Sequence, residues 1–204
     1  MIARRKLFHL GLGAVGAGLL GPSAYAGPSI TTRPVVQVAP EPEADIIGAI
    51  LSAPEPKWLA LHNVHTEEKL EAVYWENGAY VPDALEALNK VLRDYRTGEE
   101  RAMDPQLFDL LGAIQGKTGT RQPFQVISGY RSPATNAMLH ERSGEVAKRS
   151  LHMDGKAMDI YLEDVALDRL RAAALAIGGG GVGYYPDTRF VHVDVGPVRR
   201  WQGS

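Results

Sequence analysis

Hydrophobic and polar positions divide the chain from Lys57 onward into short strands and amphipathic helices. Period-two alternation between turn residues predicts strands, and leucines three or four positions apart predict helices that bury one face. The predicted strands cover residues 57–64, 70–75, 79–81, 124–127, 157–162, 182–185 and 190–195, and the predicted helices cover 83–95, 106–115, 134–141 and 164–177. Helices gathered early and strands late, without regular βαβ alternation, predict an α+β fold. We expect a small central antiparallel sheet with flanking helices.

The first 26 residues have the pattern of an export signal. Two arginines and a lysine at positions 4–6 precede an uncharged, glycine-rich run over 7–21, and Ala24-Tyr25-Ala26 has the form of a signal peptidase site. That run is shorter than the ~20 residues that a membrane-spanning helix needs. The paired arginines favour the twin-arginine route. We expect a signal peptide over 1–26, periplasmic location and membrane contact only during export; a retained anchor is the alternative.

A proline-rich stretch follows the signal. Residues 27–56 hold six prolines and few bulky apolar side chains, which is typical of an extended linker, broken at most by a helical turn near 45–51. Residues 57–204 then suit one globular domain, expected to be a monomer. Cleavage after residue 26 leaves 19 basic against 24 acidic side chains, a net charge of −5. This balance lacks the basic excess that nucleic-acid binding requires.

The residue types available for chemistry are restricted, because the chain contains no cysteine. Histidine and carboxylates are therefore its strong metal ligands. Asp159 lies on the otherwise apolar strand 157–162, and His192 and Asp194 share one face of the strand 190–195. Polar groups are costly to bury without partners. The alternation therefore indicates a site on the open face of the sheet.

His152 lies seven residues before Asp159. On one continuous helix this spacing would separate them by about 10.5 Å, too far to share an ion. Gly155 favours a sharp reversal instead, and if the two polar strands lie near each other, His192 joins the pair. A structural aspartate and a satisfied core histidine are the alternative interpretations. Asp194, about 6.6 Å beyond His192 along the strand, suits a general base or a support for the site better than a ligand.

The same segments resemble a known family, the zinc D-alanyl-D-alanine peptidases, a group that includes lysostaphin-type enzymes and sonic hedgehog. The resemblance extends from about residue 57 to residue 201 and is closest to the murein endopeptidases of the group. The motifs that carry it are Ser150-x-His152-x-x-Gly155-x-Ala157-x-Asp159, Phe190-Val191-His192-Val193-Asp194, Ser128-Gly129-Tyr130-Arg131-Ser132, Gly181-Val182-Gly183-Tyr184-Tyr185-Pro186 and Gly196-Pro197.

The resemblance implies an enzyme that hydrolyses the peptide cross-links of peptidoglycan, preferably those that join two diaminopimelate residues. It implies Zn²⁺ held by His152, Asp159 and His192 on the open face of the sheet. Arg131 would line the active site and either stabilise the oxyanion or hold a substrate carboxylate. The alternative from another class is a catalytically silent, zinc-stabilised module that binds peptidoglycan.

The general base is where this chain departs from the family. Several relatives carry an acidic catalytic residue three positions before the last zinc ligand, where this chain has Arg189. Asp194 follows the pattern of the closer relatives, so it is the expected base. Asp187 is the reserve candidate.

Residues around the motifs receive supporting roles. Ser150 is expected to donate a hydrogen bond that supports the metal ligands. Tyr184 or Tyr185 is expected to contact substrate; both follow a run of four glycines that is expected to be mobile. His140 is expected at the surface. Residues 199–201, Arg-Arg-Trp, are expected to form a solvated tail.

Overall fold

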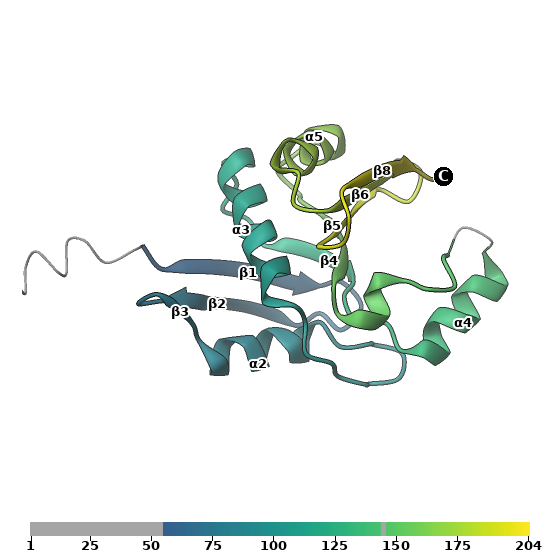
Figure 1. Cartoon of the computed structure of the whole chain (residues 1–204), viewed down its shortest axis with the longest axis horizontal. Coiled ribbons are helices and arrows are strands. Elements are labelled where there is room, and N and C mark those ends of the chain that lie inside the picture. The colour runs from purple at the N-terminus through teal and green to yellow at the C-terminus, as the bar shows by residue number, and fades with distance from the viewer. Residues whose placement is uncertain (1–54, 144–145) are drawn as a thin grey trace, which may run out of the picture. The chain divides into compact units, whose positions relative to one another are not determined.

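The computed structural model describes residues 55–143 and 146–204, which form one mixed sheet of eight strands in the order β3-β2-β1-β4-β5-β7-β6-β8 (Figure 1). The strands are β1 (Lys57–Asn63), β2 (Lys69–Glu76), β3 (Ala79–Tyr80), β4 (Phe124–Ser128), β5 (Ala157–Tyr161), β6 (Gly181–Tyr185), β7 (Phe190–Asp194) and β8 (Arg199–Gln202). Neighbours are antiparallel except for the parallel pairs β1–β4 and β6–β8. The expected signal peptide, the helical turn near 45–51 and nearly all of the expected linker lie outside the described residues.

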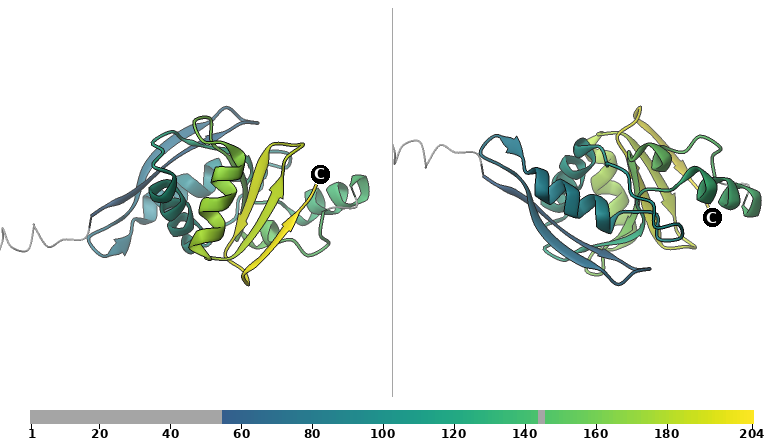
Figure 2. Two further views of the ribbon diagram at one scale, coloured as in Figure 1. Left: turned by 90° about the horizontal axis from the view of Figure 1, so that it is seen from above. Right: turned by 90° about the horizontal axis from the view of Figure 1, so that it is seen from below.

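Four α-helices and one 3₁₀ turn accompany the sheet in these residues. They are α2 (Pro82–Val91), α3 (Pro105–Thr118), α4 (Pro133–Arg142), η1 (Leu151–Asp154) and α5 (Leu167–Ile177). The helices α2, α3 and α4 each begin with a proline, which leaves no backbone N–H unpaired there. Helices α3 and α5 lie side by side (Figure 2), and α2 packs against β2. None of the described helices is long and apolar enough to cross a membrane.

The hydrophobic core includes one face of the central strands. Met158 and Ile160 of β5 and Val191 and Val193 of β7 have no solvent exposure and belong to the same core cluster as Leu170 of α5. Burial of each such side chain contributes about 1.5–3 kcal/mol. Because side chains alternate along a strand, the residues between these apolar positions face the other side of the sheet.

The predicted elements are confirmed in order and type, with three differences. The α+β class holds, but the sheet is larger than the small antiparallel sheet expected, because a long connection through α2 and α3 brings β4 back parallel to β1. The helix expected to reach residue 95 ends at Val91, and the following Asp94 turns inward to accept a hydrogen bond from the backbone N–H of Ser132. Residues 199–202 form β8 rather than a solvated tail.

Candidate metal centre

His152, Asp159 and His192 meet on the open face of the sheet. Strand β5 pairs with β7, and the register places Asp159 opposite His192. The Oδ1 atom of Asp159 lies 2.9 Å from Nδ1 of His192 and 3.2 Å from Nε2 of His152, and these two nitrogens are 3.2 Å apart. All three side chains are buried. Among the described residues, they alone form a group of three or more histidines and carboxylates with this geometry.

The donor set fits a tetrahedral metal ion. Bonds of about 2.0–2.1 Å in tetrahedral geometry place ligand atoms about 3.3 Å apart, close to the separations in the cluster. Nδ1 of His152 donates to the carbonyl of Gly129 at 2.7 Å, and Nε2 of His192 donates to Asp194 at 3.0 Å. These bonds assign the tautomers and leave the other ring nitrogens with lone pairs directed at the Asp159 carboxylate. Three converging lone pairs are the environment that a cation stabilises.

The turn η1 brings His152 over the sheet. Ser150 precedes it, and its hydroxyl accepts a hydrogen bond from the backbone N–H of His152 at 3.4 Å. Gly155 ends the turn with φ 68°, and a Cβ there would lie 2.5 Å from the carbonyl oxygen of Ala102. Only glycine suits this backbone. The predicted reversal at Gly155 is confirmed, and Ser150 caps the turn rather than bonding a ligand ring.

The loop after β4 supplies the carbonyl that orients His152. A Cβ on Gly129 would lie 2.5 Å from the carbonyl oxygen of Leu92, and that same oxygen accepts the N–H of Tyr130 at 2.8 Å. Asp94, itself buried, accepts the N–H of Ser132 at 2.8 Å. The loop is therefore held at two points against the end of α2.

Arg131 lies in this loop and lines the cavity above the cluster, as expected. Its Nη2 lies 3.3 Å from Oδ2 of Asp159 and 3.3 Å from the hydroxyl of Ser128. Its Nε is buried without a hydrogen-bond partner. Asp159 thus directs one oxygen to the histidines and the other to a guanidinium. The role of Arg131 toward substrate stays a prediction.

Burial and neighbouring charges set the protonation of the cluster. Burial lowers the pKa of His152. Burial alone would raise the pKa of Asp159, but charge and hydrogen bonds from the two histidines outweigh it and hold that pKa well below its usual range. For His192, burial acts to lower the pKa, while hydrogen bonds with Asp159 and Asp194 outweigh it and raise the pKa. Metal binding requires the ionised Asp159 and the neutral His152, whereas the raised pKa means that His192 releases its extra proton when a metal binds.

Asp194 is surrounded by hydrogen-bond donors and has no solvent exposure. Its Oδ1 accepts from the N–H groups of Gly181 (3.0 Å) and Gly196 (2.8 Å), and its Oδ2 accepts from His192. The guanidinium of Arg199 bonds both oxygens, at 3.0 and 2.7 Å. Burial acts to raise the pKa of Asp194, but these donors outweigh it and lower the pKa well below its usual range. The role of general base stays a prediction, and the geometry favours a different one, which is to hold His192.

The reserve candidate for the base lies elsewhere. Asp187 is exposed in the connection between β6 and β7 and does not line the cavity. The neighbouring Arg189, at the position where several relatives carry the acidic residue, is also exposed.

Four neighbouring strands place two rows of residues on the polar face. The first row is Asp159–His192–Gly183–Trp201, and the second is Ala157–Asp194–Gly181–Arg199, in which Gly181 is joined to Asp194 by its N–H. A Cβ on Gly183 would lie 2.6 Å from the indole of Trp201, so glycine leaves the space in which this ring packs 5.1 Å from the ring of His192. Gly181 likewise leaves room for Asp194 and Arg199. These glycines serve close packing rather than mobility.

Arg199 and Trp201 were not predicted to belong to the site. The available signal was a shared spacing of two: Gly181 and Gly183, His192 and Asp194, and Arg199 and Trp201 each lie two positions apart, on three strands. A solvated tail needs no such alternation.

A cavity of about 670 Å³ opens above the cluster. Tyr185 lines it, stacks on Phe190 with ring centroids 4.4 Å apart, and accepts a hydrogen bond from Nε1 of Trp201 at 2.9 Å. Tyr184 packs against the core, with the guanidinium of Arg171 4.7 Å from its ring. Of the two tyrosines expected at the substrate, the structure therefore places only Tyr185 at the cavity.

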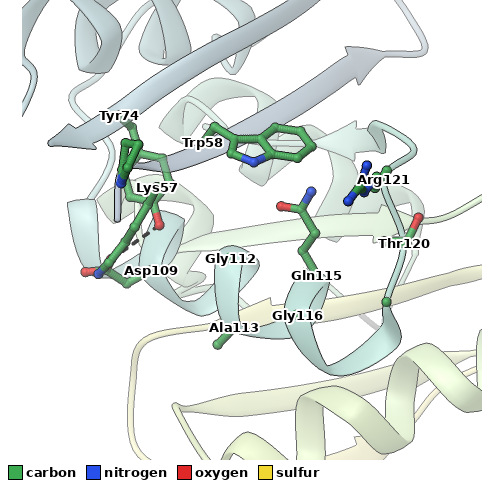
Figure 3. A pocket seen from close by; sticks show the side chains of 12 residues that line it. Lys57, Trp58, Tyr74, Asp109, Gly112, Ala113, Gln115, Gly116, Thr120 and Arg121 are labelled. Atoms are coloured by element: carbon green, nitrogen blue, oxygen red, sulfur yellow. Dashed lines mark hydrogen bonds and ion pairs between the residues drawn. The ribbon is translucent and has the colours of Figure 1, made fainter. Parts of the chain in front are cut away.

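A second cavity of about 590 Å³ lies between β1 and α3, under the indole of Trp58 (Figure 3). No histidine lines it. Its carboxylate, Asp109, already pairs with Lys57 at 2.7 Å and accepts hydrogen bonds from Tyr74 and Tyr80. The groups able to bind a metal or activate water lie at the other cavity.

A buried His–Asp–His cluster at the floor of a cavity is the kind of site that metallopeptidases use. The family model described as peptidoglycan L,D-endopeptidase MepK matches residues 51–201. Peptidoglycan L,D-endopeptidase MepK of Escherichia coli (strain K12) is 43% identical over 198 residues, which cover 97% of this chain and 96% of that protein. The chain therefore belongs to the peptidoglycan L,D-endopeptidase MepK family, and the resemblance drawn from its motifs is confirmed.

A second relative extends the match to another organism. The protein named probable peptidoglycan L,D-endopeptidase MepK of Haemophilus influenzae is 42% identical over 156 residues, which cover 76% of this chain and 84% of that protein. No solved structure gives a significant match. The range matched by the family model includes the whole cluster, and the chain is an enzyme of the peptidase class.

Proposed function

We propose that this chain is a zinc-dependent endopeptidase that hydrolyses the peptide cross-links of peptidoglycan. The observation that carries the proposal is the coincidence of the buried His152–Asp159–His192 cluster with 43% identity to a protein named peptidoglycan L,D-endopeptidase. The absence of cysteine leaves nitrogen and oxygen donors, and the near-tetrahedral spacing of these donors suits zinc.

The residues of the site divide into ligands and their supports. His152, Asp159 and His192 would hold the ion, which when bound supplies a Lewis acid that polarises the scissile carbonyl and lowers the pKa of water. Asp194 holds the proton of His192 on Nε2 and so keeps Nδ1 free. Arg131 fixes the second oxygen of Asp159, and its place in the lining of the cavity supports a contact between its guanidinium and a substrate oxygen.

The stereochemistry in the relatives' names supports a proposal for the type of cross-link. A link between two diaminopimelate residues joins an L-centre carbonyl to a D-centre amine and is an L,D amide. A D-alanine–diaminopimelate link joins two D-centres. We propose that the chain prefers the first, and that it acts in the periplasm, where its export signal would deliver it to this substrate.

Purified muropeptide dimers of each linkage test the proposal. Zinc-loaded protein should convert the diaminopimelate–diaminopimelate dimer to monomers faster than the D-alanine–diaminopimelate dimer, and a chelator should stop both reactions. Cleavage of only the second dimer would overturn the preference and keep the enzyme. Failure to cut either dimer while zinc stays bound would favour a module that only binds the wall.

A further inference from the structure

Arginines dominate the charged side chains around the cavity above the cluster. Arg131, Arg142, Arg149 and Arg199 line it, whereas Asp159 is the only lining carboxylate side chain in the part of the chain that the structure describes. The whole sequence has 22 lysines and arginines against 24 aspartates and glutamates. The lining of the cavity therefore has an excess of positive side chains, although the protein as a whole has an excess of negative ones.

Two of these arginines are already neutralised and two are not. Arg131 contacts Asp159, and Arg199 bonds both oxygens of Asp194. Arg142 and Arg149 are exposed, and neither guanidinium pairs with a carboxylate within residues 55–143 and 146–204. A guanidinium stays charged throughout the physiological pH range. No described carboxylate neutralises them, so both side chains bring positive charge to the cavity.

The backbone that carries Arg149 is held in place by α4. The buried amide of Asn136 donates to the carbonyls of residues 147 and 148, at 3.1 and 3.3 Å. Nδ1 of His140 lies 2.6 Å from the carbonyl oxygen of Val146, so this histidine anchors the connection rather than lying idle at the surface. The turn η1 begins two residues after Arg149. An anchored segment therefore positions this side chain between α4 and the ligand-bearing turn.

A purely structural explanation covers only one of the two residues. Arg142 lies in the last turn of α4, where the helix dipole favours a cation. Arg149 lies outside any helix and has no such partner. Exposed arginines are ordinary on protein surfaces, but two unpaired ones on the wall of the same cavity as a candidate metal centre are a recognition feature.

We propose that Arg142 and Arg149 form a second carboxylate-binding subsite on the α4 side of the cavity. This inference rests on the proposed function and deepens it: the subsite selects cross-links whose peptides carry a free carboxylate over those in which it is amidated. The planar guanidinium forks match a carboxylate in bidentate fashion, which an amide cannot reproduce. A cavity of about 670 Å³ has room for the residues on both sides of the scissile amide.

The test compares two substrates and two variants. The substrates are the diaminopimelate–diaminopimelate dimer with free carboxylates and the same dimer with its carboxylates converted to primary amides. The double variant Arg142→Gln/Arg149→Gln keeps polar side chains and removes two charges. The control Arg200→Gln removes a charge from an exposed residue of β8 that does not line the cavity.

We expect the double variant to lose about 10–100-fold in kcat/KM on the acidic dimer, chiefly through KM, since each charge-assisted contact is worth about 3–10-fold at an exposed site. On the amidated dimer it should stay within about twofold of the wild type. The Arg200→Gln control should match the wild type on both, and all three proteins should melt at the same temperature. Equal losses on both dimers, or no loss on the acidic one, would overturn the subsite.

Equilibrium binding keeps this inference separate from the proposed function. If the wild type cuts neither dimer, the proposed function fails, and the subsite is judged by titrating the uncut dimers into each protein. Tighter binding of the acidic dimer by the wild type, lost in the double variant and kept in Arg200→Gln, supports it. Equal binding of acidic and amidated dimers refutes it.

Discussion

Replacing Asp194 by asparagine separates two roles for this residue, holding His192 and acting as the general base. The carboxylate accepts five hydrogen bonds, and every neighbour is a donor. An asparagine that keeps the three bonds of Oδ1 turns its NH₂ toward His192 and Arg199. The imidazole must then accept at Nε2 and carry its proton on Nδ1, the nitrogen directed at Asp159.

The magnitude follows from these contacts. A lost outer partner of a ligand histidine costs about 10–100-fold in metal affinity. Loss of two charge-assisted bonds at about 1.5–3 kcal/mol each in a residue without solvent exposure lowers the free energy of unfolding by about 3–6 kcal/mol. For a domain of this size that lowers the melting temperature by about 10 °C. Loss of a general base would instead lower the rate about 10²–10⁴-fold and leave zinc affinity unchanged.

Chelator competition, thermal melting and turnover at saturating zinc measure the three quantities. The matched control is Asp187→Asn, which alters an exposed carboxylate away from the cavity and should leave all three unchanged. If Asp194→Asn binds zinc within twofold of the wild type while turnover falls by a hundredfold or more, the positioning argument is refuted and Asp194 takes the proton directly. A large loss of turnover in Asp187→Asn would move that role to Asp187.

Three further predictions concern the metal, the aromatic wall and the fold. Metal analysis should find one zinc per chain in the wild type and none in His152→Ala or His192→Ala. Full retention of zinc in both variants would show that these histidines are not the ligands. Gly183→Ala should destabilise the protein by about 1–3 kcal/mol and change the fluorescence of Trp201, since the new methyl group overlaps the indole; an unchanged melting curve would contradict this packing. Burial acts to raise the pKa of Asp109, but its lysine and tyrosine partners outweigh it and lower the pKa. The ionised Asp109 therefore adds about 1–2 kcal/mol to the free energy of unfolding. This contribution is complete above about pH 4 and is lost as the pH falls through the pKa of Asp109 in the folded protein. Urea unfolding of Asp109→Asn should show that deficit at pH 7 and a smaller one at pH 3, and an equal deficit at both would be evidence against it.

Local patterns were sufficient for most elements and for the face of the sheet on which the candidate ligands lie. Alternation along strands β5 and β7 assigns Asp159 and His192 to the face opposite Met158 and Val191, because the side-chain period of a strand is two. Gly155 marks the reversal that brings His152 back, because its positive φ strains other residues. These inferences need only the neighbours of each residue in the chain.

The partners of Asp194 were beyond such patterns. From the sequence alone, a carboxylate two positions after a candidate ligand histidine is equally suited to be a general base or to hold that histidine in place. The structure surrounds it with donors: Gly196 bonds it locally, as in an Asx turn, but Gly181 is thirteen residues away in the chain and Arg199 reaches it from β8. The expectation of a mobile glycine run and a solvated tail hid two of these donors, because Gly181 is the first residue of β6 and Arg199 is the first residue of β8.

The sequence by itself determined which side chains are polar within apolar strands, where the turns fall and which donor atoms a metal has available. Only the tertiary structure decided that β6 lies between β7 and β8, that glycines on β6 admit Trp201 and Arg199, and that four arginines line one cavity. The physical reason is that strand order and register depend on how the faces of distant segments pack, whereas alternation and turn formation depend on each residue's own backbone and its nearest neighbours.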